Sequence, residues 1–244
     1  MRIPRLFVDL PLAAGSPIEV TDERAHYLRN VLRLRPGAEV DLFNAGSGEW
    51  RATMKAIQRR TILLEIGAQT RKPEPVAGPV LYFSPIRRNR LEWMLEKAVE
   101  LGVKALVPVI TERSVVELGR PDRLRGRLIE AAEQCERLDV PEIGETVALE
   151  DVVESGVPLI VGDERRDDGS LLQALEDLPD AGLLVGPEGG FASGERELLI
   201  DSGARMVSFG PLILRSETAA LHMLSAWRAL ETDLVEAEPD DGQA

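Results

Sequence analysis

Short apolar segments alternate with segments of helical periodicity from residue 80 to residue 231, and this alternation limits the possible folds more than any other feature. Five apolar runs are expected as strands, at 80–86, 105–110, 157–162, 182–186 and 206–209. Expected helices lie at 89–102, 122–137, 170–178, 194–202 and 217–231. The pattern predicts an α/β fold with a parallel sheet that is buried on both faces. Ligands of such sheets bind beyond the carboxyl ends of the strands.

Residues 1–70 follow a different, β-rich pattern. Strands are expected at 5–10, 38–43, 49–58 and 61–68, where Val, Ile, Thr and Leu are frequent. One helix is expected at 22–34, with Leu28, Val31 and Leu32 on one face.

Three prolines and a glycine interrupt the chain between Arg71 and Pro79. Such a segment cannot sustain a helix or a central strand, so we expect the domain boundary there. The expected domains are a small β-rich domain at 1–72 and an α/β domain at 73–234. An acidic, disordered tail is expected at 235–244.

The composition excludes several classes of protein. The chain has a single cysteine, which excludes an internal disulfide. With only two histidines in addition, it has too few ligands for a typical structural zinc site. The sequence has neither a Walker A motif nor a Gly-x-Gly-x-x-Gly fingerprint. No apolar run approaches the roughly 20 residues that span a bilayer, and residues 1–7 lack the apolar core of a secretory signal. We therefore expect a cytoplasmic protein that binds no metal and no membrane.

Charge is distributed unevenly along the chain. The net charge of −13 argues at first against an RNA partner. However, residues 1–72 hold 12 Lys and Arg against 8 Asp and Glu, whereas six acids lie from Glu231 to the end. Only four of the 29 cations are lysine, and arginine binds phosphate in a bidentate manner and stacks on bases. The N-terminal domain is compatible with RNA, although genome composition and a solvated acidic surface explain the same bias.

Two segments near the C-terminus carry residue types that folding alone does not require. Gly186-Pro187-Glu188-Gly189-Gly190 follows an expected strand. Its glycines allow a tight turn and a close approach of the backbone to a ligand, but a plain turn needs no acid between glycines.

The second segment, Leu212-Ile213-Leu214-Arg215-Ser216-Glu217-Thr218-Ala219, leads into the last expected helix. Ser216 or Thr218 can cap this helix, and Glu217 suits the helix dipole. A cation immediately before the helix is disfavoured by the same dipole. Arg215 is therefore predicted to have a role beyond folding, such as pairing with an acid or with an RNA phosphate.

In this order the two segments resemble the signature of the RsmE family, the 16S ribosomal RNA uridine-N3 methyltransferases of the SPOUT superfamily. Further matches lie at 26–33 (HYLRNVLR), 96–103 (EKAVELGV), 111–114 (TERS) and 132–137 (AEQCER) with Pro141. Any one of these motifs is weak, but together and in order they cover residues 5–230 and form a specific signal.

The resemblance implies a fold, a cofactor and partners. It implies a PUA-like β-barrel that helps to hold RNA, followed by a SPOUT domain with a C-terminal trefoil knot. S-adenosylmethionine would lie in the knot, and the enzyme would act as a homodimer on 16S ribosomal RNA of the small ribosomal subunit. The residues implied for cofactor binding are Val161, Gly162, Gly186, Pro187, Glu188, Gly189, Gly190, Leu212, Ile213, Leu214, Ser216 and Thr218.

The reaction implied is direct methyl transfer to N3 of a uridine. This nitrogen carries a proton and lies on the pairing edge, so the base must be unpaired and the proton must leave. Arg215 is the candidate for orienting the RNA or stabilising the uracil anion. Glu188 and Glu217 are candidates for accepting the proton, although each can also simply structure its loop.

Phosphate contacts are expected from arginines of both domains. In the N-terminal domain the candidates are Arg24, Arg29, Arg33, Arg51, Arg59 and Arg60. After the first strand of the larger domain they are Arg87, Arg88 and Arg90.

Two other functions stay open. The chain could be a SPOUT methyltransferase that acts on tRNA or on a ribose 2′-oxygen. It could also be a non-catalytic RNA-binding or ribosome-assembly factor that keeps the fold and binds no cofactor. The N-terminal domain and the Leu-Arg-Ser-Glu-Thr-Ala match favour the ribosomal RNA methyltransferase.

Overall fold

The protein is described here by a computed structural model that covers residues 3–116, 118–163 and 169–237. The chain forms two compact units. The N-terminal unit comprises the residues up to Val76 together with 132–140, and the C-terminal unit comprises 77–131 and the residues from Pro141 onward. The expected linear division at 72/73 did not include the return of 132–140 to the first unit.

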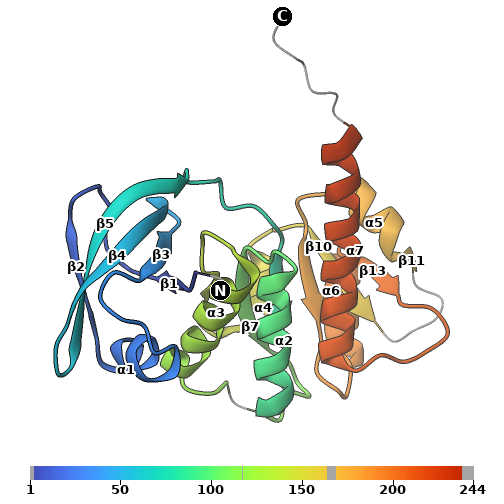
Figure 1. The fold of residues 1–244 in the computed structure, drawn as a ribbon. Coiled ribbons are helices and arrows are strands. Elements are labelled where there is room, and N and C mark those ends of the chain that lie inside the picture. Colours follow the sequence, from blue (N-terminus) through green and yellow to red (C-terminus); the bar gives the residue numbers. More distant parts are fainter. Residues whose placement is uncertain (1–2, 117, 164–168, 238–244) are drawn as a thin grey trace, which may run out of the picture. The chain divides into compact units, whose positions relative to one another are not determined.

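The N-terminal unit is built on a five-stranded sheet. Its strand order is β1 (Arg5–Phe7), β3 (Glu39–Asn44), β4 (Gly48–Ile57), β5 (Thr61–Arg71) and β2 (Pro17–Thr21). The first pair is parallel and the others are antiparallel. The long strands β4 and β5 curl (Figure 1), and among the described residues β1 and β2 do not pair with each other. The expected PUA-like barrel is therefore an open half-barrel.

Alternate residues of these strands form the core of the N-terminal unit, as the period of a strand requires. Val40, Leu42, Ala52, Met54 and Leu64 have no exposed surface. Two of these residues lie on β3, two on β4 and one on β5. The core is therefore centred on the three middle strands of the sheet.

The expected helix at 22–34 is two short helices. α1 (Asp22–His26) continues into a π-helical turn, η1 (Tyr27–Val31), in which the Leu32 amide donates to the Tyr27 carbonyl. The wider turn changes the helix face. Leu28 is buried as expected, but Val31 is 59% exposed, so its assignment to the apolar face was wrong.

Segment 132–140 is tied into the N-terminal unit by Arg5. The Arg5 guanidinium forms an ion pair with Glu49 at 2.7 Å, and the two side chains are 6% and 9% exposed. The same guanidinium donates to the carbonyls of Ala132 and Arg137, at 3.0 and 2.8 Å. The amide of Phe7 donates to the Glu133 carboxylate at 3.0 Å. A residue of the first strand therefore completes its hydrogen bonds with a segment more than 120 residues away.

The C-terminal unit contains the predicted parallel sheet. Every described strand pair in it is parallel. The strand order is β11 (Gly169–Ser170), β13 (Arg205–Ser208), β10 (Leu159–Asp163), β12 (Gly182–Val185), β6 (Val80–Phe83), β7 (Ala105–Ile110) and β8 (Glu142–Ile143), with β9 (Val147–Ala148) beside β7. The α/β fold is confirmed, whereas the trefoil knot stays a prediction.

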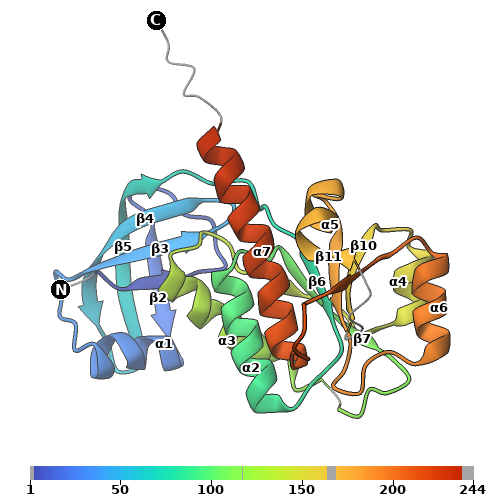
Figure 2. The same ribbon diagram turned by 90° about the vertical axis from the view of Figure 1, so that its right-hand side faces the viewer.

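Helices cover both faces of this sheet (Figure 2). On one face, α2 (Arg88–Glu100) and α5 (Leu171–Asp177) each contact α7 (Ser216–Ala237). On the other face, α4 (Leu149–Glu154) and α6 (Ser193–Asp201) contact each other. α3 (Pro121–Cys135) runs beside α2 and pairs Arg123 with Glu92 at 3.1 Å.

α7 includes residues 235–237, which were expected in the disordered tail, and residues 238–244 lie outside the described residues. Among the described residues, no helix has the length and apolarity needed to cross a membrane.

Successive residues of β10 face opposite sides of the sheet. Val161 packs in a core with Leu149 of α4 and Leu199 of α6. Gly162 faces the other way, where a Cβ would lie 3.3 Å from Met223 of α7. This alternation decides which residues at the strand end are available to a ligand on the α7 side.

Candidate functional site

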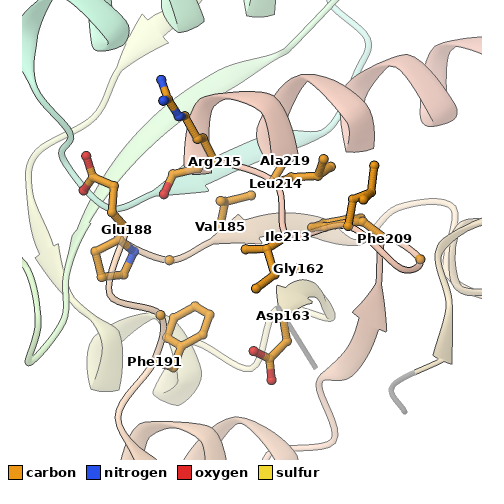
Figure 3. Close-up of a pocket in the computed structure, with 16 residues that line it drawn as sticks. Gly162, Asp163, Val185, Glu188, Phe191, Phe209, Ile213, Leu214, Arg215 and Ala219 are labelled. Carbon is orange, nitrogen blue, oxygen red and sulfur yellow. The ribbon is translucent and has the colours of Figure 1, made fainter. Parts of the chain in front are cut away.

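A cavity of about 190 Å³ lies at the carboxyl ends of β10 and β12 (Figure 3). We call it the strand-end cavity. It is lined by 162–163 at the end of β10, by most of 185–191 after β12, and by most of 209–216 before α7. These segments meet because β10 and β12 are neighbouring parallel strands. This is the position in which α/β sheets bind ligands.

Two glycines make room for the aromatic walls of the strand-end cavity. A Cβ on Gly162 would lie 2.5 Å from the Phe209 ring, and a Cβ on Gly186 would lie 3.0 Å from the Phe191 ring. Both distances are too short for close-packed carbon atoms. Phe191 and Phe209 line the cavity (Figure 3). The two glycines are therefore required by the rings that form its walls.

The loop after β12 is held by the rest of the C-terminal unit. Arg113 donates to the Gly189 carbonyl at 2.7 Å, so Gly189 faces the loop after β7 and does not line the cavity. The Glu195 carboxylate accepts hydrogen bonds from the amides of Ala192 and Glu112, at 2.8 and 2.7 Å. These contacts fix the loop before any ligand binds.

Segment 209–216 offers apolar side chains and backbone donors. Leu212 and Ile213 are 73% and 72% exposed. Among the described residues, the amides of Leu212, Ile213 and Leu214 donate to no backbone carbonyl. Apolar walls and unused backbone groups suit a ligand with a flat heteroaromatic part, because such groups fix its orientation.

Asp163 lines the strand-end cavity, although it was not predicted as a site residue. It is 7% exposed and accepts a hydrogen bond from Arg196 at 2.7 Å. The expected strand ended one residue earlier, at Gly162. An acid immediately after an expected strand was the available signal.

Most of the predicted cofactor residues meet in this one cavity. It includes Gly162, Gly186, Pro187, Glu188, Gly190, Leu212, Ile213, Leu214 and Ser216, and also Arg215, which was predicted as a catalytic residue. It does not include Val161, Gly189 or Thr218. Residues that line it but were not predicted are Asp163, Val185, Phe191, Phe209, Gly210 and Ala219.

A second cavity lies between the starts of α2 and α7, and we call it the α2–α7 cavity. Asn89, Arg90, Trp93, Ile213, Leu214, Arg215, Glu217 and Thr218 line it. The two cavities share residues 213–215. The charged groups of Arg215 and Glu188 point away from Phe191 and Asp163 (Figure 3). These two charged groups are therefore directed away from the Phe191 wall of the cavity.

Arg90 lies between the two carboxylates that were predicted as proton acceptors. Its guanidinium is 3.8 Å from Glu188 and 3.6 Å from Glu217. The Glu188 side chain is 34% exposed, whereas that of Glu217 is 8% exposed. Arg90 was predicted to contact RNA phosphate, but in the structure it is paired within the protein.

The other predicted RNA-binding arginines divide into two groups. The first group is paired within the protein. Arg24 donates to the Phe7 carbonyl, and Arg29 donates to the carbonyls of Gln58 and Arg59. Arg51 pairs with Asp41 and Glu39, and Arg88 pairs with Glu92. In the part of the chain that the structure describes, no acidic partner lies within 4 Å of Arg33, Arg59, Arg60, Arg87 or Arg215.

Among the described residues, no three His, Cys, Asp or Glu side chains are grouped so that they could hold a metal ion. The charged groups near the two cavities are instead arginines and carboxylates, several of them in ion pairs. They suit an organic ligand and a polyanion.

Comparison with known proteins gives two matching domain families. Residues 72–228 match the RNA methyltransferase domain, and residues 20–67 match the RNA methyltransferase PUA domain. The two matches together cover most of the chain.

Individual relatives agree with these families. Ribosomal RNA small subunit methyltransferase E of Rickettsia conorii is 31% identical over 94% of this chain and 97% of its own length. The Bacillus subtilis protein of the same name is 26% identical over 91% of this chain and 94% of its own.

Among solved structures, ribosomal RNA small subunit methyltransferase E of Neisseria gonorrhoeae, bound to S-adenosylmethionine, has a TM-score of 0.83 and 28% identity. It is matched over 94% of this chain and 98% of its own. A methyltransferase of Legionella pneumophila in complex with the same cofactor has a TM-score of 0.84 and 27% identity.

Proposed function

The chain belongs to the ribosomal RNA small subunit methyltransferase E family, and we propose that it transfers a methyl group from S-adenosylmethionine to N3 of a uridine in 16S ribosomal RNA. The strand-end cavity is the observation that carries this proposal. Its shape is set by two glycines and two aromatic rings, and the amides of Leu212, Ile213 and Leu214 donate to no backbone carbonyl of the described residues. The relative of this chain from Neisseria gonorrhoeae was crystallised with S-adenosylmethionine.

The residues of the strand-end cavity fit that cofactor. Phe191, Phe209 and Leu214 offer apolar contact to an adenine ring. The amides of 212–214 offer hydrogen bonds to its edge. When bound, S-adenosylmethionine supplies a methyl group that is already activated by the positive sulfur.

The protein's own side chains then have two tasks at the uridine. Uracil N3 becomes a good nucleophile only after it loses its proton, so a carboxylate must accept that proton. The anion that forms is stabilised by a nearby cation, and Arg215 has no acidic partner among the described residues. Arg215 is the proposed anion-stabilising residue, and Glu188 and Glu217 are the proposed acceptors.

The N-terminal unit would hold the RNA. Arg59 and Arg60 lie around a surface depression with Tyr27, Val31 and Arg29. Tyr27 is 40% exposed, so a single-stranded base can stack on it while the arginines contact phosphate. The substrate is therefore proposed to be an unpaired region of 16S ribosomal RNA in the small ribosomal subunit, in the cytoplasm.

A homodimer is also part of the proposal. Leu212 and Ile213 are adjacent and more than 70% exposed, although both line the strand-end cavity. Large apolar side chains that are exposed together are typical of surfaces that another chain covers. A second copy of this chain would cover them and complete the cofactor site. Light scattering of the purified protein measures this directly.

The function is tested on small ribosomal subunits from a strain that lacks this gene. Incubation with the protein and S-adenosylmethionine should create one N3-methyluridine in 16S ribosomal RNA, detected by mass spectrometry of nuclease digests. Methyl transfer to tRNA or to a ribose 2′-oxygen would contradict the proposal. Absence of S-adenosylmethionine binding in calorimetry would favour the non-catalytic RNA-binding factor.

A further inference from the structure

The carboxylate of Glu217 has one oxygen that finds no hydrogen-bond partner in the described part of the chain. Glu217 lies in the first turn of α7 and is 6% exposed. Its Oε1 atom lies 3.6 Å from Arg90 Nε, whereas its Oε2 atom is buried and accepts no hydrogen bond from the described residues. Buried acceptors are nearly always satisfied in folded proteins, so an unsatisfied one indicates a donor that arrives from outside.

The surroundings of this oxygen suit a flat, polar ring. Glu217 lines the α2–α7 cavity together with Trp93 and Arg215. Trp93 is 47% exposed, which is unusual for so large an apolar side chain. Aromatic side chains on such surfaces are the usual stacking partners of unpaired bases.

The α2–α7 cavity adjoins the strand-end cavity. Residues 213–215 line both. A group held in one cavity therefore lies next to a group held in the other, as transfer between them requires.

We propose that the α2–α7 cavity binds the target uracil, with Glu217 Oε2 as the acceptor of the N3 proton and Trp93 as the stacking surface. This inference rests on the proposed function and selects between its two acceptors. The Glu188 side chain is 34% exposed and therefore solvated, whereas the Glu217 side chain is 8% exposed. An N3–H donor satisfies Glu217 Oε2 directly.

The transfer balances without a further reactant. The N3–H bond breaks as its proton passes to Glu217, and the electron pair of N3 forms the bond to the methyl carbon. The bond between that carbon and sulfur breaks, and its electron pair stays on sulfur, which becomes neutral. The proton on Glu217 is then released to water.

Arg90 is a positioning residue in this scheme. It lies on α2 between Glu188 and Glu217 and is itself 29% exposed in its side chain. Its contact is with Oε1 of Glu217, so Oε2 is left without a partner among the described residues. Arg90→Lys should retain part of the rate that Arg90→Ala loses, because a cation remains near the carboxylate.

The decisive variant is Glu217→Gln, which keeps the shape and removes the proton acceptor. We expect kcat to fall by at least about a hundredfold, as general bases typically contribute that much. S-adenosylmethionine affinity, measured by calorimetry, should stay within about twofold. Glu197→Gln is the matched variant, because Glu197 is exposed on α6 and lines neither cavity, and it should retain kcat.

Substrate acidity separates a catalytic role from a structural one. RNA that contains 5-fluorouridine has a more acidic N3 proton and depends less on a base. The kcat of the Glu217→Gln variant should be at least about tenfold higher on this RNA than on ordinary RNA. A misfolded variant would show no such gain. A Glu217→Gln protein that methylates N3 of ordinary RNA at more than half the normal kcat would overturn this inference and leave the proposed function standing. A wild-type protein that transfers no methyl group would overturn the proposed function instead.

The stacking role of Trp93 has its own variants. Trp93→Ala should raise KM for RNA about tenfold, and Trp93→Phe should restore most of the loss because the ring remains. Ile200→Ala on α6 is the control, since Ile200 is 45% exposed and lines neither cavity. If Trp93→Ala converts a dimer into monomers and leaves KM unchanged, a second copy of the chain covers this cavity and the assignment to uracil is wrong.

Discussion

Arg196 Nε donates a hydrogen bond to Asp163 Oδ2 at 2.7 Å, beside the strand-end cavity. The Arg196 side chain is 17% exposed and the Asp163 side chain is 6% exposed. One carboxylate of the proposed cofactor site is therefore held by a helix on the far side of the sheet. α6 contributes to the site without reaching it.

Arg196→Met should destabilise the protein, because it removes the charge that neutralises a buried carboxylate. We expect the free energy of unfolding to fall by about 3 kcal/mol, measured by urea denaturation, and S-adenosylmethionine affinity to fall with it. Arg205→Met is the control. The Arg205–Asp177 pair is exposed on the surface, at 48% and 40%, so its loss should cost less than about 1 kcal/mol.

Gly162→Ala should damage the strand-end cavity. The new Cβ would lie 2.5 Å from the Phe209 ring and 3.3 Å from Met223, so the ring must move. We expect S-adenosylmethionine to bind at least about tenfold more weakly, corresponding to about 1.4 kcal/mol, in calorimetry. Gly194→Ala on α6 is the control, because no atom lies within 4 Å of its Cβ position. Equal affinity of the two variants would argue against this cavity as the cofactor site.

Arg215→Ala should leave the fold intact and remove most of the methyl transfer. Its guanidinium points away from Phe191 and Asp163, and no described carboxylate pairs with it. We expect kcat to fall about a hundredfold or more, as when one stabilising donor is removed from an anionic site. The unfolding midpoint should stay within error of the wild type. Full activity of the variant would remove the proposed role of Arg215.

Arg59→Ala combined with Arg60→Ala should weaken RNA binding without affecting the cofactor site. Each phosphate contact that is lost should reduce the slope of log affinity against log salt by about 0.7 for single strands, or about 1.4 for both. Fluorescence anisotropy with a labelled RNA at several salt concentrations measures this slope. Lys55→Ala is the control, because Lys55 already pairs with Glu65 at 3.0 Å. An unchanged slope in the double variant would place the RNA elsewhere.

Tyr82 should make stability depend on pH in the alkaline range. Burial raises the pKa of the Tyr82 phenol above its ordinary value of 10. The folded state therefore holds this proton more tightly than the unfolded state, and the resulting stability is complete below pH of about 10. It declines as pH rises through the pKa of the folded state.

Tyr82→Phe should remove that part of the decline when urea denaturation is followed from pH 9 to pH 11. Tyr27→Phe, at a tyrosine that is 40% exposed, is the matched control. The same alkaline decline in wild type and Tyr82→Phe would show that other groups cause it.

The alternating strands and helices of the C-terminal unit were predictable from the sequence. Strands that are buried on both faces are apolar runs, and the helices that cover them have one apolar face. The strand at Ala105–Ile110 has the expected bounds, and the helix at Arg88–Glu100 buries the expected face of Leu91, Met94 and Leu95. Short elements were missed. β8 and β9 have two residues each and exist only through pairing with β7, which sequence periodicity cannot show.

The candidate site was predictable to the level of segments rather than side chains. Val161 and Gly162 are neighbours in sequence, yet the alternation of β10 buries Val161 on the α6 side and leaves Gly162 at the cavity. Arg24, Arg29 and Arg90 were expected to contact RNA because they are arginines. Their pairing within the fold depends on residues distant in the sequence, such as Phe7, Arg59 and Glu217.

The ion pair of Arg5 with Glu49, together with its bonds to residues 132–137, has a consequence for the order in which the chain folds during synthesis. The half-barrel is encoded by the first part of the chain, but its buried arginine is satisfied only by residues translated much later. Until residue 140 has left the ribosome, the N-terminal unit lacks these acceptors and holds a guanidinium with unfilled hydrogen bonds. A gene fragment that ends at the proline-rich segment would therefore encode an incomplete folding unit, although every strand of its sheet is present.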